Sequence, residues 1–169
     1  MRTFTILDSH SSLVQRTRLW NLWEQNLNDL CCDVKECIGA TALVDTLAES
    51  GIPMAIATSS RMESVEHKRY AIGHLFRPMA TIVAGDDPYV PNGKPAPDIF
   101  LEAARRLRVD PKACLVFEDS TAGCQAAKAA GCVVIAVPDS RMDKSAFGGI
   151  ADYVLDDLTC FDANAWGIL

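Results

Sequence analysis

The sequence predicts an α/β fold, a three-layer Rossmann-like arrangement in which helices cover both faces of a parallel sheet. Short apolar segments without polar alternation follow one another from residue 52 onward, and helical segments separate them. Such apolar segments are typical of strands that are buried on both faces of a parallel sheet. Polar residues directly follow several of these segments, and in a parallel sheet those positions lie at one edge. We therefore expect the functional site at the carboxyl edge of the sheet.

The first half of this pattern runs from residue 40 to residue 84. An amphipathic segment over 40–50 predicts a helix, and the Gly51 that follows is a common helix stop. The apolar segment 52–57 predicts a strand that ends in a Thr-Ser-Ser sequence. A polar helix is expected over 62–71, then a short turn near 74–77, and a second strand over 80–84.

The second half runs from residue 97 to residue 155. Pro97 is suited to the first turn of a helix, which we expect to extend through Leu107 with one apolar face. A buried strand is predicted over 113–117, and an alanine-rich helix over 121–130 that Gly131 stops. Strands are also expected over 132–137 and 153–155.

Length and composition fit one domain over residues 1–169. The net charge of −6 argues against a surface that binds nucleic acid or an anionic membrane. No apolar run approaches the roughly 18 to 20 residues that span a bilayer. The seven cysteines are odd in number and widely scattered, which is typical of reduced thiols. We expect a soluble cytoplasmic protein with no nucleic-acid or membrane partner.

Two polar groups point to phosphoryl transfer. Glu118 and Asp119 follow the predicted strand 113–117, and carboxylates are the hard oxygen ligands that Mg²⁺ takes. Lys94 lies in a Gly-Lys-Pro-Ala-Pro loop, which can hold a positive charge at a fixed place for a phosphate. Each group also has a simpler reading, since lysines are usually solvated and acids are favoured near a helix N-terminus. Their occurrence together favours the functional reading.

Two further polar clusters follow strands. Thr58 and Ser59 could bind phosphate or simply cap the next helix. Asp86 and Asp87 could orient a lysine or a metal, but a turn before Pro88 explains them equally well.

Over residues 40–169 these segments resemble the haloacid dehalogenase-like (HAD) hydrolase superfamily. The stretch 51–61 (GIPMAIATSSR) is similar to its second motif. The stretches 85–88 (GDDP) and 92–101 (NGKPAPDIFL) are similar to its third, and 114–120 (CLVFEDS) to its fourth. The motifs and the tail over 161–169 resemble the subgroup of small-metabolite phosphatases typified by pseudouridine-5′-phosphatase.

The resemblance implies a role for each motif residue. Thr58 would hydrogen-bond the phosphate, with the backbone of Ser59 assisting. Lys94 would neutralise charge on the nucleophile and on the transferred phosphoryl group. Asp119 would bind Mg²⁺ directly, and Glu118 would bind it directly or through water.

The first motif of this superfamily is an Asp-x-Asp sequence after the first strand, and here it is weak. The candidate is Asp8, which follows an apolar run, with His10 at the place of the second aspartate. In one reading Asp8 is the nucleophile and a metal ligand, and His10 acts as acid and base, which its ordinary pKa near 6.5 would allow. In the other reading residues 1–38 replace or truncate the true first strand.

Relatives in the subgroup insert a helical cap domain between the first and second motifs. Here that interval has room for one long helix, so we expect a helical remnant over 11–38 in place of an absent or vestigial cap. Trp20 and Trp23 lie on this helix and could mark a homodimer interface or a core position, of which we favour the core.

The leading function is a Mg²⁺-dependent phosphatase that hydrolyses a small phosphorylated metabolite through an aspartyl-phosphate. The alternative is a weak or inactive pseudoenzyme, derived from such a phosphatase, that binds phosphate or a protein partner. Asp8 and His10 are the residues that distinguish the two.

Overall fold

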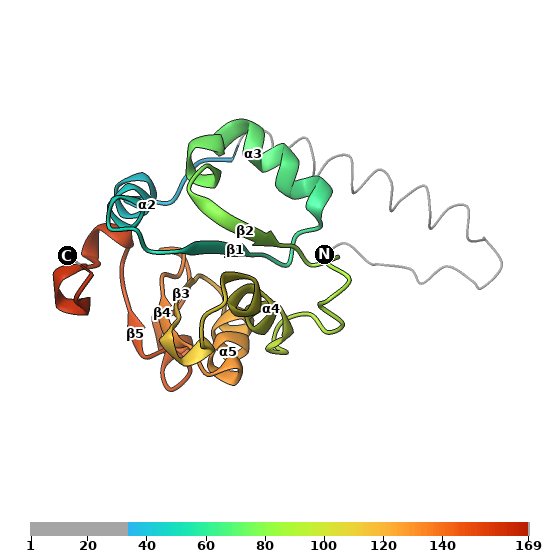
Figure 1. Cartoon of the computed structure of the whole chain (residues 1–169). Coiled ribbons are helices and arrows are strands. Elements are labelled where there is room, and N and C mark those ends of the chain that lie inside the picture. The colour runs from blue at the N-terminus through green and yellow to red at the C-terminus, as the bar shows by residue number, and fades with distance from the viewer. Residues whose placement is uncertain (1–33, 169) are drawn as a thin grey trace, which may run out of the picture.

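A computed structural model describes residues 34–168, which form an α/β fold with parallel strands (Figure 1). The predicted fold class is therefore confirmed. The predictions for Asp8, for His10 and for the helical remnant and its tryptophans up to residue 33 lie outside the described residues. Within 34–168, no helix has the length and apolar content that crossing a bilayer requires.

The first part of the fold is a pair of parallel strands joined by a helix. Strand β1 (Met54–Ala57) pairs with β2 (Met79–Val83), and α3 (Met62–Phe76) connects them. Helix α3 merges the predicted helix over 62–71 with the turn that was expected after it. The two helical parts meet at a kink at Ile72, where φ is −125° and ψ is 38°.

Helix α2 (Ala40–Glu49) precedes this unit and packs against the C-terminal segment of the chain (Figure 1). The Leu158 N–H donates to the Ile38 carbonyl at 3.2 Å. Beyond this contact, the Phe161 ring packs edge-on against Phe117 of the sheet, with ring centroids 5.1 Å apart, and stacks on Trp166. The C-terminal segment from Leu158 to Trp166 therefore lies against the start of α2 and against Phe117.

The second part of the fold contains three parallel strands in the order β3-β4-β5. Strand β3 (Leu115–Glu118) pairs in register with β4 (Val133–Ala136), and β4 pairs with the short β5 (Tyr153–Val154). Helix α5 (Thr121–Ala130) joins β3 to β4, with the bounds that the sequence predicted. Short 3-10 turns make up the remaining regular structure: Pro111–Ala113, Lys144–Phe147, Leu158–Cys160 and Asn164–Trp166.

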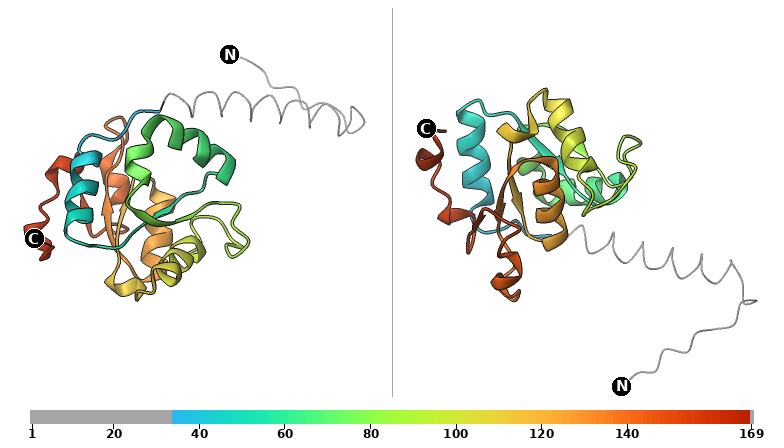
Figure 2. Two further views of the ribbon diagram at one scale, coloured as in Figure 1. Left: turned by 45° about the horizontal axis from the view of Figure 1, so that its top comes forward. Right: turned by 90° about the horizontal axis from the view of Figure 1, so that it is seen from below.

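Helix α4 (Asp98–Leu107) holds the two parts together. It contacts β1 and β2 on one side and lies beside α5 on the other (Figure 2). Ile99 and Phe100 of α4 enter the same core as Val83 of β2 and Val134 of β4. Ala126 and Ala127 of α5 are fully buried, and their small side chains let α5 pack close to its neighbours.

The described strands form two sheets rather than one continuous sheet, because β1 and β3 do not pair with each other. The Thr58 N–H donates to Val83 in β2, so by alternation the backbone groups of Ala55 and Ala57 face away from β2. The Val137 N–H donates to the Glu118 carbonyl, so the backbone groups of Phe117 likewise face away from β4. Within the described part of the chain, β1 and β3 each keep one edge without a strand partner.

Candidate functional site

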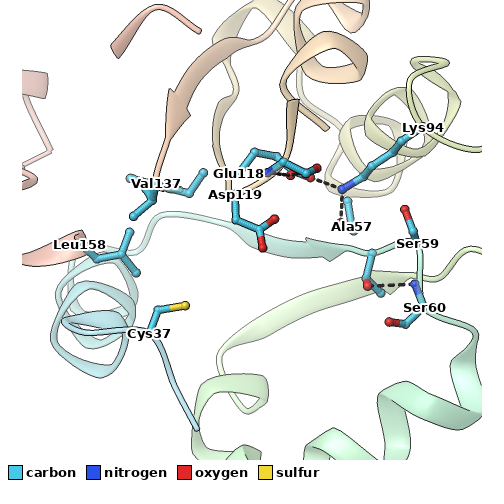
Figure 3. A pocket seen from close by; sticks show the side chains of 12 residues that line it. Cys37, Ala57, Ser59, Ser60, Lys94, Glu118, Asp119, Val137 and Leu158 are labelled. Carbon is cyan, nitrogen blue, oxygen red and sulfur yellow. Dashed lines mark hydrogen bonds and ion pairs between the residues drawn. The ribbon is translucent and has the colours of Figure 1, made fainter. Parts of the chain in front are cut away.

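A pocket of about 490 Å³ lies where β1 and β3 end (Figure 3). It therefore opens at the carboxyl edge of the strands, where the sequence predicted the site. Its lining includes Thr58, Ser59, Lys94, Glu118 and Asp119, which come from three separate segments of the chain. The residues that line it are Cys37, Ala57, Thr58, Ser59, Ser60, Lys94, Phe117, Glu118, Asp119, Ser120, Val137 and Leu158.

The Thr-Ser-Ser sequence after β1 forms the first wall of the pocket. Thr58 continues the strand pairing through its N–H, and its hydroxyl accepts a hydrogen bond from the Ser60 N–H at 3.1 Å. Lys68 of α3 donates to the Ser60 hydroxyl at 2.8 Å, a contact that the sequence did not suggest. Gly85 lies against this turn so closely that a Cβ there would be 2.3 Å from the Ser59 carbonyl oxygen. The turn is thus held from both sides.

Lys94 brings a positive charge to the centre of the site. Its ammonium forms an ion pair with the Glu118 carboxylate and lies 3.4 Å from the Ala57 carbonyl oxygen (Figure 3). It also lies 4.9 Å from the centre of the Phe100 ring. Only 11% of the Lys94 side chain and 7% of the Glu118 side chain are exposed. This burial distinguishes Lys94 from an ordinary solvated surface lysine.

Glu118 is held by the start of α5 as well as by Lys94. The Ser120 hydroxyl donates to the Glu118 carboxylate at 3.1 Å and also accepts from the Gly123 N–H at 3.0 Å, so it caps the helix. The carboxylate of Glu118 is therefore already engaged by a cation and a hydroxyl, whereas the sequence suggested a metal-binding group. Nearby, burial and then the Glu118 charge raise the pKa of the Cys124 thiol to about 11, which keeps it protonated.

Asp119 differs from Glu118 in that its carboxylate points into the pocket (Figure 3). The residue is exposed, and no hydrogen bond or ion pair engages its carboxylate within the described part of the chain. A free, solvated carboxylate of this kind fits Mg²⁺, which often takes one or two protein carboxylates and keeps several waters. Among residues 34–168 no cluster of three or more metal-binding side chains occurs, so Asp119 and Glu118 would supply only part of such a site.

Asp86 and Asp87 do not line the pocket. The Asp86 carboxylate accepts from the Met62 N–H at 2.9 Å, which caps the start of α3. The Asp87 carboxylate is paired with Arg106 of α4 at 2.6 Å and accepts from the Tyr89 N–H at 3.0 Å. The sequence left open a turn before Pro88 or a role in orienting a lysine or metal, and the structure shows the turn, with Asp86 also capping α3.

Asp139, which follows β4, is engaged in the same local way. Arg141 binds its carboxylate through two side-chain contacts of 2.7 and 2.9 Å, and these hydrogen bonds hold the pKa of Asp139 at about 2. Convergence at the carboxyl edge thus applies to the polar groups after β1 and β3 and to Lys94, but not to those after β2 and β4.

An apolar wall completes the pocket and was not predicted as part of the site. It consists of Cys37, Phe117, Val137 and Leu158. Burial, followed by the charge of Asp119, raises the pKa of the Cys37 thiol. Phe117 and Val137 lie at strand ends and could have been included on that ground. Nothing in the sequence near Cys37 or Leu158 signals their position, because both arrive through long-range packing.

Comparison with known proteins gives one family for this arrangement. Residues 21–131 match the family model described as haloacid dehalogenase-like hydrolase. The chain is 46% identical over 148 residues to (DL)-glycerol-3-phosphatase 1, mitochondrial, of Arabidopsis thaliana, covering 86% of this chain and 49% of that protein. It is 43% identical over 133 residues to the probable pseudouridine-5'-phosphatase of Drosophila melanogaster, covering 77% and 57%. The chain thus spans about half the length of these curated relatives.

Two solved structures are also similar to this chain in fold and sequence. The crystal structure of CbbY from Rhodobacter sphaeroides in complex with phosphate is 29% identical, with a TM-score of 0.75 over 92% of this chain and 68% of that one. The structure of a putative beta-phosphoglucomutase from Thermotoga maritima is 30% identical, with a TM-score of 0.70 over 88% and 68%.

Proposed function

We propose that this chain, which belongs to the haloacid dehalogenase-like hydrolase family, hydrolyses a phosphate monoester of a small metabolite. One observation carries the proposal. The Thr58 hydroxyl, the Lys94 ammonium and the Asp119 carboxylate, which has no partner among residues 34–168, line one pocket at the carboxyl ends of β1 and β3. A cation and a hydroxyl suit a phosphate, and a free carboxylate suits the metal that accompanies it.

The polar wall of the pocket suits a phosphoryl group. Lys94 is largely buried, so its charge acts across a medium that screens it less than water does. The Thr58 hydroxyl and the Ser59 backbone N–H would supply hydrogen-bond donors at the same place, whereas the Ser60 N–H already donates to the Thr58 hydroxyl. These groups would bind the phosphoryl oxygens and stabilise the charge that they carry in the transition state. The relatives named above as phosphatases of glycerol-3-phosphate and of pseudouridine-5'-phosphate support a small phosphorylated substrate.

Mg²⁺ is the cofactor that we propose. Asp119 would bind it directly, and Glu118 and Asp8 would bind it directly or through water. The ion would neutralise negative charge on the phosphoryl oxygens. Since Glu118 is paired with Lys94, the free Asp119 carboxylate is the better donor of the two described acids.

Asp8 is the proposed nucleophile. Among residues 34–168, β1 and β3 each have one edge without a strand partner, and this edge would suit an apolar strand that ends in a carboxylate. The segment 4–7 (FTIL) is apolar and Asp8 follows it directly, which is the order of the first motif of the family. In the second reading of the sequence this strand is missing, and the pocket binds phosphate without turnover.

The proposed reaction has two steps. The Asp8 carboxylate attacks phosphorus, the phosphorus–oxygen bond of the ester breaks, and His10 gives a proton to the departing alkoxide. His10 then takes a proton from a water molecule, which attacks phosphorus in the aspartyl-phosphate. This second step releases inorganic phosphate and restores the Asp8 carboxylate.

The experiment is phosphate release from p-nitrophenyl phosphate with and without Mg²⁺. Wild type should show Mg²⁺-dependent turnover, and Asp8→Asn should reduce it to background because the amide cannot act as the nucleophile. Asp45→Asn, on the exposed face of α2, is the matched control and should keep full activity. Turnover that persists in Asp8→Asn would refute the mechanism.

A parallel titration with inorganic phosphate separates the two proposed functions. Calorimetric binding of phosphate by wild type, without turnover of any phosphate ester, would favour the phosphate-binding pseudoenzyme. If wild type neither binds phosphate nor hydrolyses esters, both functions are wrong.

A further inference from the structure

The Glu118 carboxylate occupies a small space between the end of β3 and the first turn of α5. Glu118 is buried, and its carboxylate meets Lys94 on one side and the Ser120 hydroxyl on the other. The position of this carboxylate decides where the Lys94 ammonium rests, because Glu118 is its charged partner among the described residues.

Gly123 of α5 leaves the room for that carboxylate. A Cβ at this position would lie 2.1 Å from both Cδ and Oε2 of Glu118 and 2.3 Å from Oε1. No real Cβ comes this close to three atoms of a carboxylate, so any other residue at 123 must displace Glu118. The three atoms are the far end of the Glu118 side chain, so they would move by side-chain rotation, and this rotation would take the carboxylate away from the Lys94 ammonium and the Ser120 hydroxyl.

Backbone conformation gives no other reason for a glycine here. Gly123 lies in the first turn of an ordinary α-helix, and it is not among the glycines with positive φ. Glycine weakens a helix relative to alanine, and alanine is the commonest residue of α5. Helix propensity alone would therefore favour alanine at position 123, whereas the clash of a Cβ with Glu118 disfavours it.

We propose that Gly123 is a positioning residue that sets the place of Lys94 in the pocket by seating the Glu118 carboxylate. The proposal rests on the proposed function for the meaning of Lys94. Gly123 touches neither the substrate nor the metal in this proposal. It acts on phosphate binding indirectly: Gly123 leaves room for the Glu118 carboxylate, and this carboxylate holds the Lys94 ammonium in place through their ion pair.

The test compares Gly123→Ala with Gly73→Ala. Gly73 in α3 has no neighbouring atom within 4 Å of an added Cβ, so its substitution should leave phosphate binding and turnover unchanged. Gly123→Ala should lower the affinity for inorganic phosphate, measured by calorimetry, at least tenfold. It should also raise KM more than it lowers kcat for p-nitrophenyl phosphate, whereas partial unfolding would lower the active fraction and leave KM unchanged.

A rescue variant covers the case in which Gly123→Ala does not fold. Glu118→Asp shortens the carboxylate side chain by one methylene group, which withdraws it from an added Cβ. The double variant Glu118→Asp/Gly123→Ala should therefore fold. Where Gly123→Ala binds phosphate more weakly than Glu118→Asp does, the double variant should recover at least half of that difference in phosphate affinity. Absence of recovery, or phosphate affinity in Gly123→Ala equal to that of wild type, would overturn the proposal.

Crystal structures of wild type and of a folded variant at position 123 make the proposal independent of activity. Displacement of the Glu118 carboxylate and of the Lys94 ammonium in the variant supports the positioning role even if wild type has no phosphatase activity. Both groups in their wild-type places would overturn the proposal, and would leave the proposed function intact.

Discussion

Removal of Lys94 should destabilise the whole protein as well as abolish phosphate binding. Lys94→Met keeps the length and the apolar stem of the side chain but deletes the charge, which leaves the Glu118 carboxylate buried without a cation. Only 7% of the Glu118 side chain is exposed, so water replaces the lost partner only in part. Breaking a buried ion pair from one side typically costs about 3–5 kcal/mol. The Ser120 hydrogen bond remains, so we expect a loss of about 3 kcal/mol in the free energy of unfolding.

Urea unfolding followed by far-UV circular dichroism measures this loss. Lys128→Met is the matched control, because Lys128 pairs with Asp152 on the surface, where 43% and 33% of the side chains are exposed. That variant should lose about 0–1 kcal/mol. The double variant Lys94→Met/Glu118→Gln should recover more than half of the stability that Lys94→Met loses. A Lys94→Met protein within about 1 kcal/mol of wild type would refute the reasoning, since it would mean that the carboxylate is not confined.

Two further predictions follow from the described carboxylates. Asp119→Asn should abolish Mg²⁺-dependent turnover of p-nitrophenyl phosphate while leaving the melting temperature unchanged, because the carboxylate has no partner in the described part of the chain; a large drop in melting temperature would contradict this. Hydrogen bonds from Arg105 and then from Arg106 lower the pKa of Glu102 from 4.5 to about 2. The stabilisation from this pairing is therefore complete above about pH 4.5 and is lost as the pH falls toward 2. Glu102→Gln should cost about 1–2 kcal/mol at pH 7, after allowance for the exposed Arg105, and the difference from wild type should shrink in urea titrations at pH 3. An equal difference at both pH values would contradict the assignment.

The elements of the fold could be predicted from the sequence where local signals and tertiary packing agree. The alanine-rich segment 121–130, with a serine before it and Gly131 after it, gave the bounds of α5 correctly. The kink at Ile72 was not predicted, because nothing in the polar sequence of α3 marks where one helical part gives way to the next. The arrangement of the described strands in two sheets also depends on long-range pairing, which a single sequence does not show.

Parts of the site followed from one geometrical rule. Parallel strands end at a common edge, so Thr58 and Asp119 could be expected to meet, and the structure places them around one pocket. The same rule fails for Asp87, because Arg106 of α4 lies close enough to bind its carboxylate. It is also silent on Gly123, whose importance depends on the side-chain rotamer of a glutamate five residues earlier. Sequence spacing locates strand ends, whereas the partner of each side chain depends on packing.

The arrangement of the described strands in two parallel units also affects how the pocket forms. Residues 54–83 and 115–154 each build a parallel unit from nearby segments, so each unit can form through local contacts. The pocket lies between the units, and α4 contacts both of them. Loosening α4 should therefore let the units separate, with the strands within each unit still paired. Amide hydrogen exchange would report this as pocket residues that open at lower free energy than the core of either unit. Substitutions in α4 should therefore weaken the pocket without changing any residue that lines it.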